Sequence, residues 1–259
     1  MELFRDTCLQ CSKVITEAYS TSFTLGIKTL DKKFHMPIYA IYGFVRCADE
    51  IVDTFHEYDK RELLQEFKRQ TYEAIDKKIS LNPVLHAFQC VVNEYNIDRA
   101  YIEAFLKSME MDLEDHAYNR ALYEEYIYGS AEVVGLMCLK VFCEGDEGLF
   151  RKLEKPARSL GAAFQKVNFL RDMRSDHEER GRVYFPAVKF ESFSNTNKSE
   201  IEADILRDFE DAYKGIMGLP KSARMGVYLA YVYYLKLFRK IQGLPATRIM
   251  KERVRVPDN

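Results

Sequence analysis

The feature that most constrains how this chain can fold is the helical spacing of its apolar residues, which recurs along almost the whole sequence. We find no clear alternation of apolar and polar residues of the kind that is typical of a half-buried strand. Only 7 prolines and 12 glycines occur among 259 residues, so long helices can run without interruption. The sequence therefore predicts an all-α protein. The expected helices cover residues 4–19, 37–55, 60–78, 83–94, 98–115, 121–142, 147–178, 199–217, 220–242 and 246–252.

No linker and no change of composition divides the sequence, so we expect a single all-α domain over residues 1–259. The hydrophobic content of 47% is that of an ordinary globular protein with a sizeable core. With 38 basic and 40 acidic residues the net charge is -2, which gives no reason to expect nucleic acid as a partner. The segment 191–199 is the stretch that we expect to be irregular.

The cysteines and the N-terminus bear on the cellular compartment. Cys8 and Cys11 form one C-x-x-C pair without a second pair, so we expect free thiols in a reducing compartment. The N-terminal residues lack the basic and apolar regions of a signal peptide, and we expect no stretch of about 18 apolar residues that could span a bilayer. These observations predict a cytoplasmic protein and leave peripheral contact with a membrane open; they do not predict an oligomeric state.

Two pairs of aspartates share one spacing, and each pair follows an apolar segment. Asp49 and Asp53 come after the apolar run 36–45, and Asp172 and Asp176 come after a second such segment. Four residues turn a helix by about 400°, so positions i and i+4 lie on the same face. The two predicted stripes comprise Tyr42, Arg46, Asp49 and Asp53 on the first helix, and Gly161, Gln165, Asn168, Asp172 and Asp176 on the second.

An isolated D-x-x-x-D pair is often no more than a solvated charged face. Here the run 36–45 leaves the first helix apolar nearly all round, which implies burial and directs the carboxylates into a cavity. Carboxylate and amide oxygens without nearby His or Cys suit Mg²⁺, with Mn²⁺ as the alternative ion. Two facing stripes would hold a diphosphate through bridging ions. Other phosphate-binding and nucleophile motifs are missing, which leaves metal-assisted departure of a diphosphate as the expected chemistry.

At these residues the sequence resembles the squalene/phytoene synthase family, whose members condense prenyl diphosphates head to head. Six segments are similar to the motifs of that family and follow in the same order. They are YSTSF (19–23), AIYGFVRCADEIVD (40–53), SMEMDL (108–113), IYGSAEVVGLM (127–137), QKVNFLRDMRSDHEERGRVYFP (165–186) and KERVRVP (251–257). The resemblance implies an isoprenoid-synthase helical bundle around a central active-site cavity, bound Mg²⁺ and two prenyl diphosphate substrates.

The reaction that the resemblance implies has two steps. One diphosphate leaves and the double bond of the other substrate attacks, which gives a cyclopropylcarbinyl diphosphate. This second diphosphate then leaves, and the cation rearranges to a linear product. Divalent ions and cationic side chains assist the departure of diphosphate, whereas aromatic faces stabilise a carbocation that is shielded from water.

The resemblance also implies roles for three groups of residues. The implied metal ligands are Asp49, Asp53, Asp172 and Asp176, joined by Asn168 through its amide oxygen. The implied diphosphate contacts are Arg46, Arg171 and Arg182, with Arg180 as the alternative to Arg182. The implied cavity residues are Ser20, Ser22, Tyr42, Tyr128, Gln165 and Tyr234, and among these Tyr128 would position the leaving diphosphate or steady the cation.

Several of these residues have a simpler interpretation. Arg171 and Arg182 could do no more than neutralise the acidic cluster 176–179. Tyr42 and Tyr234 could be core residues, since a tyrosine at helical spacing is more often packed than catalytic.

Two segments and Glu132 each have two possible interpretations, and Asp112 has one. The segment 227–238 is either a cavity wall or an amphipathic helix that lies on a membrane, and the basic segment 248–255 is either a solvated tail or a contact to anionic lipid. Glu132 stands where the family pattern has Gly, four residues after Tyr128, so it should point the same way as Tyr128 and lie near the cavity. Either it pairs with a nearby arginine, or this helix packs less closely than is usual in the family. Asp112 is expected to be structural.

Within the family, the resemblance of the segments NFLRDMRSDHEERGRVYFP (168–186) and RVRVP (253–257) favours a phytoene synthase, which condenses two C20 geranylgeranyl diphosphates in carotenoid biosynthesis. The alternative is condensation of two C15 farnesyl diphosphates to dehydrosqualene, presqualene diphosphate or squalene. The sequence has no nicotinamide-binding motif and no membrane anchor, so we do not expect NADPH as a cofactor. A non-catalytic binding or assembly member of the fold is a further alternative, although such a protein would be expected to lose metal ligands that this chain retains.

Overall fold

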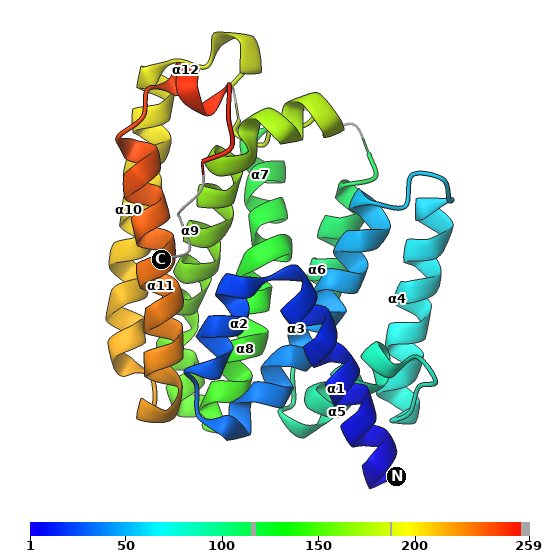
Figure 1. Ribbon diagram of the computed structural model, residues 1–259. Coiled ribbons are helices and arrows are strands. Elements are labelled where there is room, and N and C mark those ends of the chain that lie inside the picture. The colour runs from blue at the N-terminus through cyan, green and yellow to red at the C-terminus, as the bar shows by residue number, and fades with distance from the viewer. Residues whose placement is uncertain (115–117, 187, 255–259) are drawn as a thin grey trace.

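The structure is a computed structural model that describes residues 1–114, 118–186 and 188–254, apart from the side chains of Ser22, Glu179 and Arg180. Its regular elements are helices throughout these ranges, which confirms the predicted all-α class (Figure 1). The helices are α1 (Glu2–Tyr19), α2 (Thr21–Lys28), α3 (Lys32–Asp53), α4 (Lys60–Lys77), α5 (Pro83–Glu94), α6 (Arg99–Met111), α7 (Arg120–Ile127), the π-helical turn η1 (Tyr128–Glu132), α8 (Val133–Cys143), α9 (Glu147–Arg180), the 3₁₀ turn η2 (Phe190–Ser192), α10 (Asn195–Gly218), α11 (Lys221–Gln242) and α12 (Ala246–Ile249).

Helix boundaries lie close to the predicted residues where a capping side chain precedes an apolar-periodic segment. Asp59 caps α4, because its carboxylate accepts a hydrogen bond from the Glu62 amide at 3.0 Å. Asn82 caps α5 in the same way, and Pro83 occupies the first helical position, where a missing N–H costs nothing. These local signals fix the start of both helices.

The sequence did not predict α2, and it placed the start of α3 too late. Ser20 ends α1 in an extended conformation, and its hydroxyl accepts a hydrogen bond from the Phe23 amide at 3.2 Å, which starts α2. Asp31 caps α3, so Pro37 lies inside this helix instead of at its first turn. A proline there removes one helical hydrogen bond. Burial of Phe34 and Ile38, at 0% and 2% exposure, offsets that loss.

The segment 191–199, which we expected to be irregular, is partly helical. It contains η2 and the first turns of α10. Ser194 forms a capping box with Asn197, in which the Ser194 hydroxyl accepts from the Asn197 amide and the Asn197 side chain accepts from the Ser194 amide. The Ser/Asn-rich composition therefore marks a helix start.

Buried apolar side chains form two clusters, and α9 contributes to both. The first is centred on the N-terminal helices, where the ring of Phe44 stacks on Phe88 at 3.9 Å and both rings are fully buried. The second involves α7, α9, α10 and α11, and includes Phe209 and Phe238 with ring centroids 5.6 Å apart. Figure 1 shows α9 running through the middle of the bundle, so this helix supports residues from one end of the molecule to the other.

The π-helical turn η1 is held by close helix contacts on two sides. A Cβ on Gly129 would lie 2.4 Å from the Ala104 carbonyl oxygen of α6, and a Cβ on Gly161 of α9 would lie 2.6 Å from the Ala131 carbonyl oxygen. Only glycine allows backbones to approach so closely. Single π-helical turns often occur at functional sites, and this one borders the cavity described below.

The continuous helical stretch Arg120–Cys143 is long and apolar enough to cross a membrane, by length and composition alone. The expectation that no stretch would reach this length is therefore wrong. However, 56% of its most apolar window is buried inside the protein, against α3, α6 and α9. That burial is typical of the core helix of a globular protein, so this stretch is weak support for a membrane span.

Candidate active site

A cavity of about 270 Å³ lies between α2, α3, η1, α8, α9, α10 and α11. Its walls are almost wholly apolar: apart from the Cys138 thiol, the lining side chains with polar atoms are those of Ser130 and Gln165. Burial raises the pKa of the Cys138 thiol to about 12, which indicates how poorly this space would stabilise a charge. The cavity is therefore suited to a long hydrocarbon chain.

The acid stripes lie beyond one end of this cavity. In Figure 1, α3 and α9 rise toward the same end of the bundle, which we call the upper end. On α9, Leu153 and Gln165 line the cavity about 18 Å apart along the helix axis, and Asp172 and Asp176 follow further up. On α3, Ile38 and Val45 line the cavity before the aspartates are reached. Both helices thus change from apolar to acidic in the same direction.

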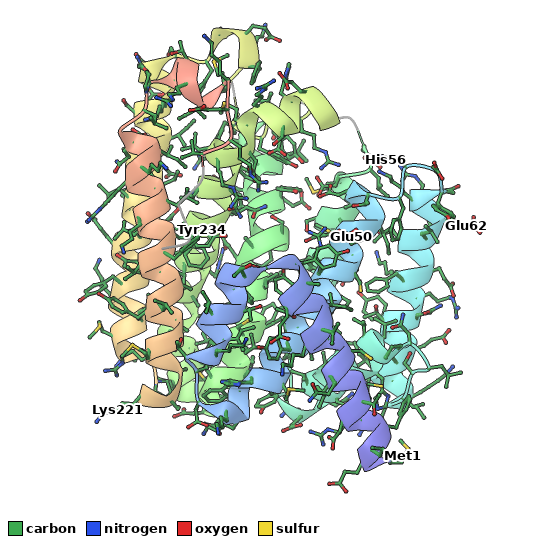
Figure 2. The ribbon with its side chains drawn as sticks, in the orientation of Figure 1. Met1, Glu50, His56, Glu62, Lys221 and Tyr234 are labelled. Atoms are coloured by element: carbon green, nitrogen blue, oxygen red, sulfur yellow. The ribbon has the colours of Figure 1, made fainter. Side chains whose placement is uncertain are left out.

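Two tyrosines pack against residues that line the cavity. Tyr42 packs on the lining residue Phe23, with ring centroids 5.0 Å apart, and Tyr234 of α11 stacks on the lining residue Phe164 at 3.9 Å. Figure 2 shows Tyr234 extending from α11 toward the interior of the bundle. Burial raises the pKa of both tyrosines, and the hydroxyls of Tyr42 and Ser20 are hydrogen-bonded to each other. Both tyrosines lie close enough to the acid stripes for their charges to act on the phenol groups. Asp49 contributes to the raised pKa of Tyr42, and Asp172 contributes to the raised pKa of Tyr234.

Arg46 pairs with acids of the first helix, α3. The Arg46 guanidinium lies 3.8 Å from Asp49, forms an ion pair with Glu50 and covers the Tyr19 ring at 4.4 Å. Glu50 is labelled in Figure 2 on α3, near the centre of the bundle. The Nε atom of Arg46 is buried and has no hydrogen-bond partner. A buried unpaired donor of this kind is suited to an anionic oxygen.

In the second stripe, Asp172 has two arginine partners. Asp172 accepts from Arg171 Nε at 3.0 Å and from Arg253 Nε at 2.7 Å. Asp172 and Asp176 are also more buried than their counterparts, since the Asp172 side chain is 17% exposed against 33% for Asp49. Arg171 thus pairs with Asp172, which lies outside the cluster 176–179, and its contact to a diphosphate stays a prediction.

Arg182 connects the two stripes. Its Nη1 atom lies 3.5 Å from Asp53 and 3.1 Å from the buried Asp112, while its backbone N–H donates to the Asp176 carbonyl at 2.9 Å. These two ion-pair partners lie outside the cluster 176–179, so Arg182 does more than neutralise that cluster. The segment that follows α9 thereby ties the end of the second stripe to the end of the first.

Asn168 provides the observation that bears most directly on a metal ion. Its amide forms a hydrogen bond with Tyr234, while its Oδ1 atom is buried without a partner. Leaving a buried carbonyl oxygen unpaired costs about 1–3 kcal/mol, and amide oxygen is a ligand that Mg²⁺ accepts. Among the described residues, no group of three or more His, Cys, Asp or Glu side chains could hold an ion together. Mg²⁺ between the two stripes therefore stays a prediction, and Asn168 Oδ1 is the oxygen whose chemistry fits such an ion.

Tyr128 is not brought together with the stripes. Its ring lies under the Arg158 guanidinium at 5.1 Å, and Arg158 forms an ion pair with Glu132 at 2.6 Å. Neither Tyr128 nor Glu132 lines the cavity, whereas Ser130 and Ala131 between them do. The prediction for Tyr128 is therefore not supported by its position, and Glu132 follows the alternative in which it pairs with an arginine.

Of the remaining predicted site residues, the structure describes the side chains of Ser20 and Gln165 and does not describe those of the others. Ser20 caps α2 and contacts Tyr42, and Gln165 lines the cavity directly below Asn168. The side chains of Ser22 and Arg180 and the end of the closing motif, residues 255–257, lie outside the described residues.

Two residues of this site were not assigned a role there from the sequence. Asp112 is expected to be structural, and it is the buried acceptor that holds Arg182 and receives a hydrogen bond from the Tyr126 hydroxyl at 2.8 Å. Arg253, in the closing basic motif, pairs with Asp172. The signals that could have found them were the central M-D-L segment and the R-x-R spacing, but neither indicates which partner each residue reaches.

An all-α bundle whose apolar cavity leads to acid stripes on two of its helices has the architecture of the isoprenoid-synthase fold. The crystal structure of squalene synthase HpnC from Alicyclobacillus acidocaldarius shares this fold, with a TM-score of 0.81 at 16% identity over 92% of this chain and 94% of that chain. The family model for squalene/phytoene synthase matches residues 16–259, so the chain belongs to this family.

Relatives of known name agree with this assignment. A phytoene synthase from Cereibacter sphaeroides is 27% identical over 241 residues, which cover 83% of this chain. The match spans 66% of that relative, so the chain corresponds to just under two thirds of its length. A 4,4′-diapophytoene synthase from Staphylococcus haemolyticus is 24% identical over 213 residues, covering 80% of this chain and 72% of the relative.

Proposed function

We propose that this protein is a prenyltransferase that condenses two prenyl diphosphates head to head, with Mg²⁺ held between the two acid stripes. The observation that carries the proposal is an apolar cavity between α3 and α9 that leads to the aspartates of both helices, which Arg182 connects. The cavity suits the hydrocarbon chains of such substrates, and the upper end suits their diphosphates.

The diphosphate end would work through side chains of this chain. Bound Mg²⁺ would neutralise charge on the leaving diphosphate. The unpaired Nε of Arg46 would donate to a diphosphate oxygen, and Asn168 would offer its unpaired Oδ1 to the ion. Arg171 and Arg253 neutralise Asp172 in the structure, so diphosphate would compete with this carboxylate for their guanidinium groups.

The apolar part would protect the cationic carbon chain. The lining side chains exclude water, which would otherwise quench a carbocation. Tyr42, Phe164 and Tyr234 lie where the cavity meets the acids, so their ring faces would be next to the reacting carbons and could stabilise positive charge there.

For the substrate we propose geranylgeranyl diphosphate, with phytoene as the product. The 27% identity to a phytoene synthase supports this choice. The similarity to a 4,4′-diapophytoene synthase keeps C15 farnesyl diphosphate as the second candidate. A non-catalytic binding or assembly role is disfavoured, because the four aspartates and Asn168 are all present.

The test is to incubate the protein separately with geranylgeranyl and farnesyl diphosphate, with Mg²⁺ or with EDTA, and to measure released diphosphate and extracted hydrocarbon. We expect a C40 hydrocarbon from the C20 substrate and no product with EDTA; Mn²⁺ should replace Mg²⁺, and NADPH should leave the product unchanged. A C30 product formed faster from farnesyl diphosphate would establish the second candidate. Absence of diphosphate release with both substrates would refute the proposed activity.

A further inference from the structure

The helix α11 has two apolar faces with different surroundings. Gly226, Val227 and Ala230 line the cavity on its inner side. On its outer side Met225 and Leu229 are 64% and 41% exposed. A soluble helix usually buries its large apolar residues on one face and exposes polar residues on the other, so the outer side of α11 is unusual.

The exposed apolar surface continues onto the neighbouring helices. Tyr228 of α11 and Tyr213 of α10 both contact the ring of Tyr231, with centroids 6.1 Å and 5.9 Å away. On the other side, Gly26 of α2 packs against α11, next to the exposed Leu25. We call the exposed set the outer face; it consists of Leu25, Tyr213, Met217, Met225, Tyr228 and Leu229.

The charges of α11 are all of one sign. The helix carries five basic residues and no acidic one, although the whole protein has a net charge of -2. Lys221 and Arg224 precede the exposed apolar residues, and Lys236, Arg239 and Lys240 follow them. Basic residues at both ends of an exposed apolar and tyrosine-bearing helix face are typical of a helix that lies in the headgroup region of anionic lipid.

We propose that the outer face binds the surface of an anionic lipid bilayer. The apolar side chains would enter the boundary between headgroups and acyl chains, the tyrosine hydroxyls would stay at the headgroups, and the basic residues would pair with anionic lipid. A second copy of this chain fits less well, because a two-fold contact through α11 would bring two basic helices together.

This surface would have a direct use if the proposed function is correct, and in that respect the inference rests on it. The part of the outer face that lies on α11 is separated from the cavity by this one helix. The seam between α11 and α2 is tight, since a Cβ on Gly226 would lie 2.8 Å from the Gly26 carbonyl oxygen. Docking would therefore place a cavity wall that is one helix thick on the bilayer, which dissolves both prenyl substrates and hydrocarbon product.

The experiment is flotation of the purified full chain with vesicles of phosphatidylcholine alone or mixed with an equal part of phosphatidylglycerol. We expect the protein to float with the mixed vesicles, to bind phosphatidylcholine at least about tenfold more weakly, and to be released by salt. Absence of flotation with the mixed vesicles would overturn the proposal.

Matched variants locate the surface. The pair Met225→Gln and Leu229→Gln should weaken binding at least about tenfold, and the pair Lys236→Gln and Arg239→Gln about as much. The control pair Ile79→Gln and Leu81→Gln, in the exposed loop between α4 and α5, should bind as the unchanged protein does. Loss of binding in the control pair but not in the α11 variants would overturn the assignment of this face.

Two further measurements separate the explanations. Circular dichroism melting shows whether each variant is folded, and diphosphate release in detergent shows whether it retains the proposed activity, which should be unchanged in all three pairs. Light scattering without lipid reports the oligomeric state. A dimer that Met225→Gln and Leu229→Gln dissociate, together with unaltered vesicle binding, would reassign the outer face to self-association.

Discussion

At its upper end the cavity leads to Asp53, Asp172 and their arginine partners, whereas at its lower end its walls are Leu30, Phe142, Leu153 and Leu219. The carboxylates of the upper end are partly or fully buried, so each must be compensated by a cation. The lower end has no such requirement, and its side chains contribute through apolar surface and volume alone.

The upper end therefore compensates charge, and the lower end would determine the length of chain that fits, although the same helices form both ends. Charge compensation at the upper end depends on specific pairs, such as Arg182 with Asp112, and is lost if one partner is removed. Chain length, in contrast, would depend on how much space the lower side chains leave. Substitutions at the two ends should therefore change different measured quantities, which the following predictions use.

The largest expected effect is at the upper end. Replacing Asp172→Asn removes a proposed metal ligand, so kcat for diphosphate release should fall by at least about 10²–10³-fold with either prenyl substrate. The control Asp76→Asn changes an exposed acid of α4 that pairs with Arg99, and it should keep full activity. If Asp172→Asn kept the rate and Mg²⁺ dependence of the unchanged protein, the upper end would not be the reaction site.

The second largest effect is expected at Asp112, the buried acid that holds Arg182 at the upper end. Asp112→Asn leaves the Arg182 guanidinium with a neutral partner, so the free energy of unfolding in urea should fall by about 3–5 kcal/mol. Diphosphate release should also fall, because Arg182 would lose its fixed position beside Asp53. The control Glu110→Gln, near the end of α6 as Asp112 is, breaks a partly exposed pair with Lys68 of α4 and should change stability by less than about 1 kcal/mol. Equal stability of the two variants would argue against a supporting role for Asp112.

A substitution in the apolar part should change selectivity instead of chemistry. Cys138→Phe fills part of the cavity, so the ratio of kcat/KM for C20 against C15 diphosphate should fall about 10-fold or more. Mg²⁺ dependence should not change. Cys138→Ala is the matched control and should leave the ratio within about twofold. An equal loss with both substrates would mean that the two ends are not independent.

The rate at which Cys138 is alkylated indicates whether water enters the cavity. The pKa of Cys138 is raised to about 12, so at pH 8 its thiol is almost wholly protonated and should alkylate slowly. The rate should rise about tenfold per pH unit between pH 8 and 10, as the thiolate fraction does. Mass spectrometry of iodoacetamide-treated protein measures the rate at this residue. Fast labelling at pH 8 would indicate that water enters the cavity.

The smallest effect is expected at Ser130. Its hydroxyl oxygen is buried at the cavity wall without a hydrogen-bond partner. Ser130→Ala removes this unpaired group, so the free energy of unfolding should stay the same or rise by up to about 1 kcal/mol. Urea unfolding measures it, and a loss of more than about 1 kcal/mol would show that the hydroxyl has a partner within the protein.

The acid stripes could be predicted because they depend on spacing within one regular helix. Asn168, Asp172 and Asp176 share a face of α9 for the same reason that any residues four apart do. The caps Asp59 and Asn82 likewise act on amides two or three residues away, so the start of α4 and of α5 was visible in the sequence. The helix α2 has only eight residues, which is too short for a helical period to be seen, so the sequence did not predict it.

Contacts between distant segments could not be predicted in this way. Tyr128 and Glu132 lie on the same side of the chain, as their spacing of four residues predicts, because both contact Arg158. The spacing does not indicate which way that side faces. Packing of Gly161 against Ala131 turns the side of η1 with Ser130 toward the cavity, and Tyr128 lies under Arg158. Arg182 reaches Asp53, 129 positions away, and no local spacing encodes that pair.

Short-range geometry thus sufficed for the helices, their caps and the two rows of acids, because bond geometry relates residues a few positions apart in the same way in any helix. Which row faces which, which arginine compensates which carboxylate, and which side of α11 meets the cavity depended on how the helices pack. Packing minimises exposed apolar area and unpaired charge over the whole molecule at once, so these outcomes belong to the assembled bundle and to none of its segments alone.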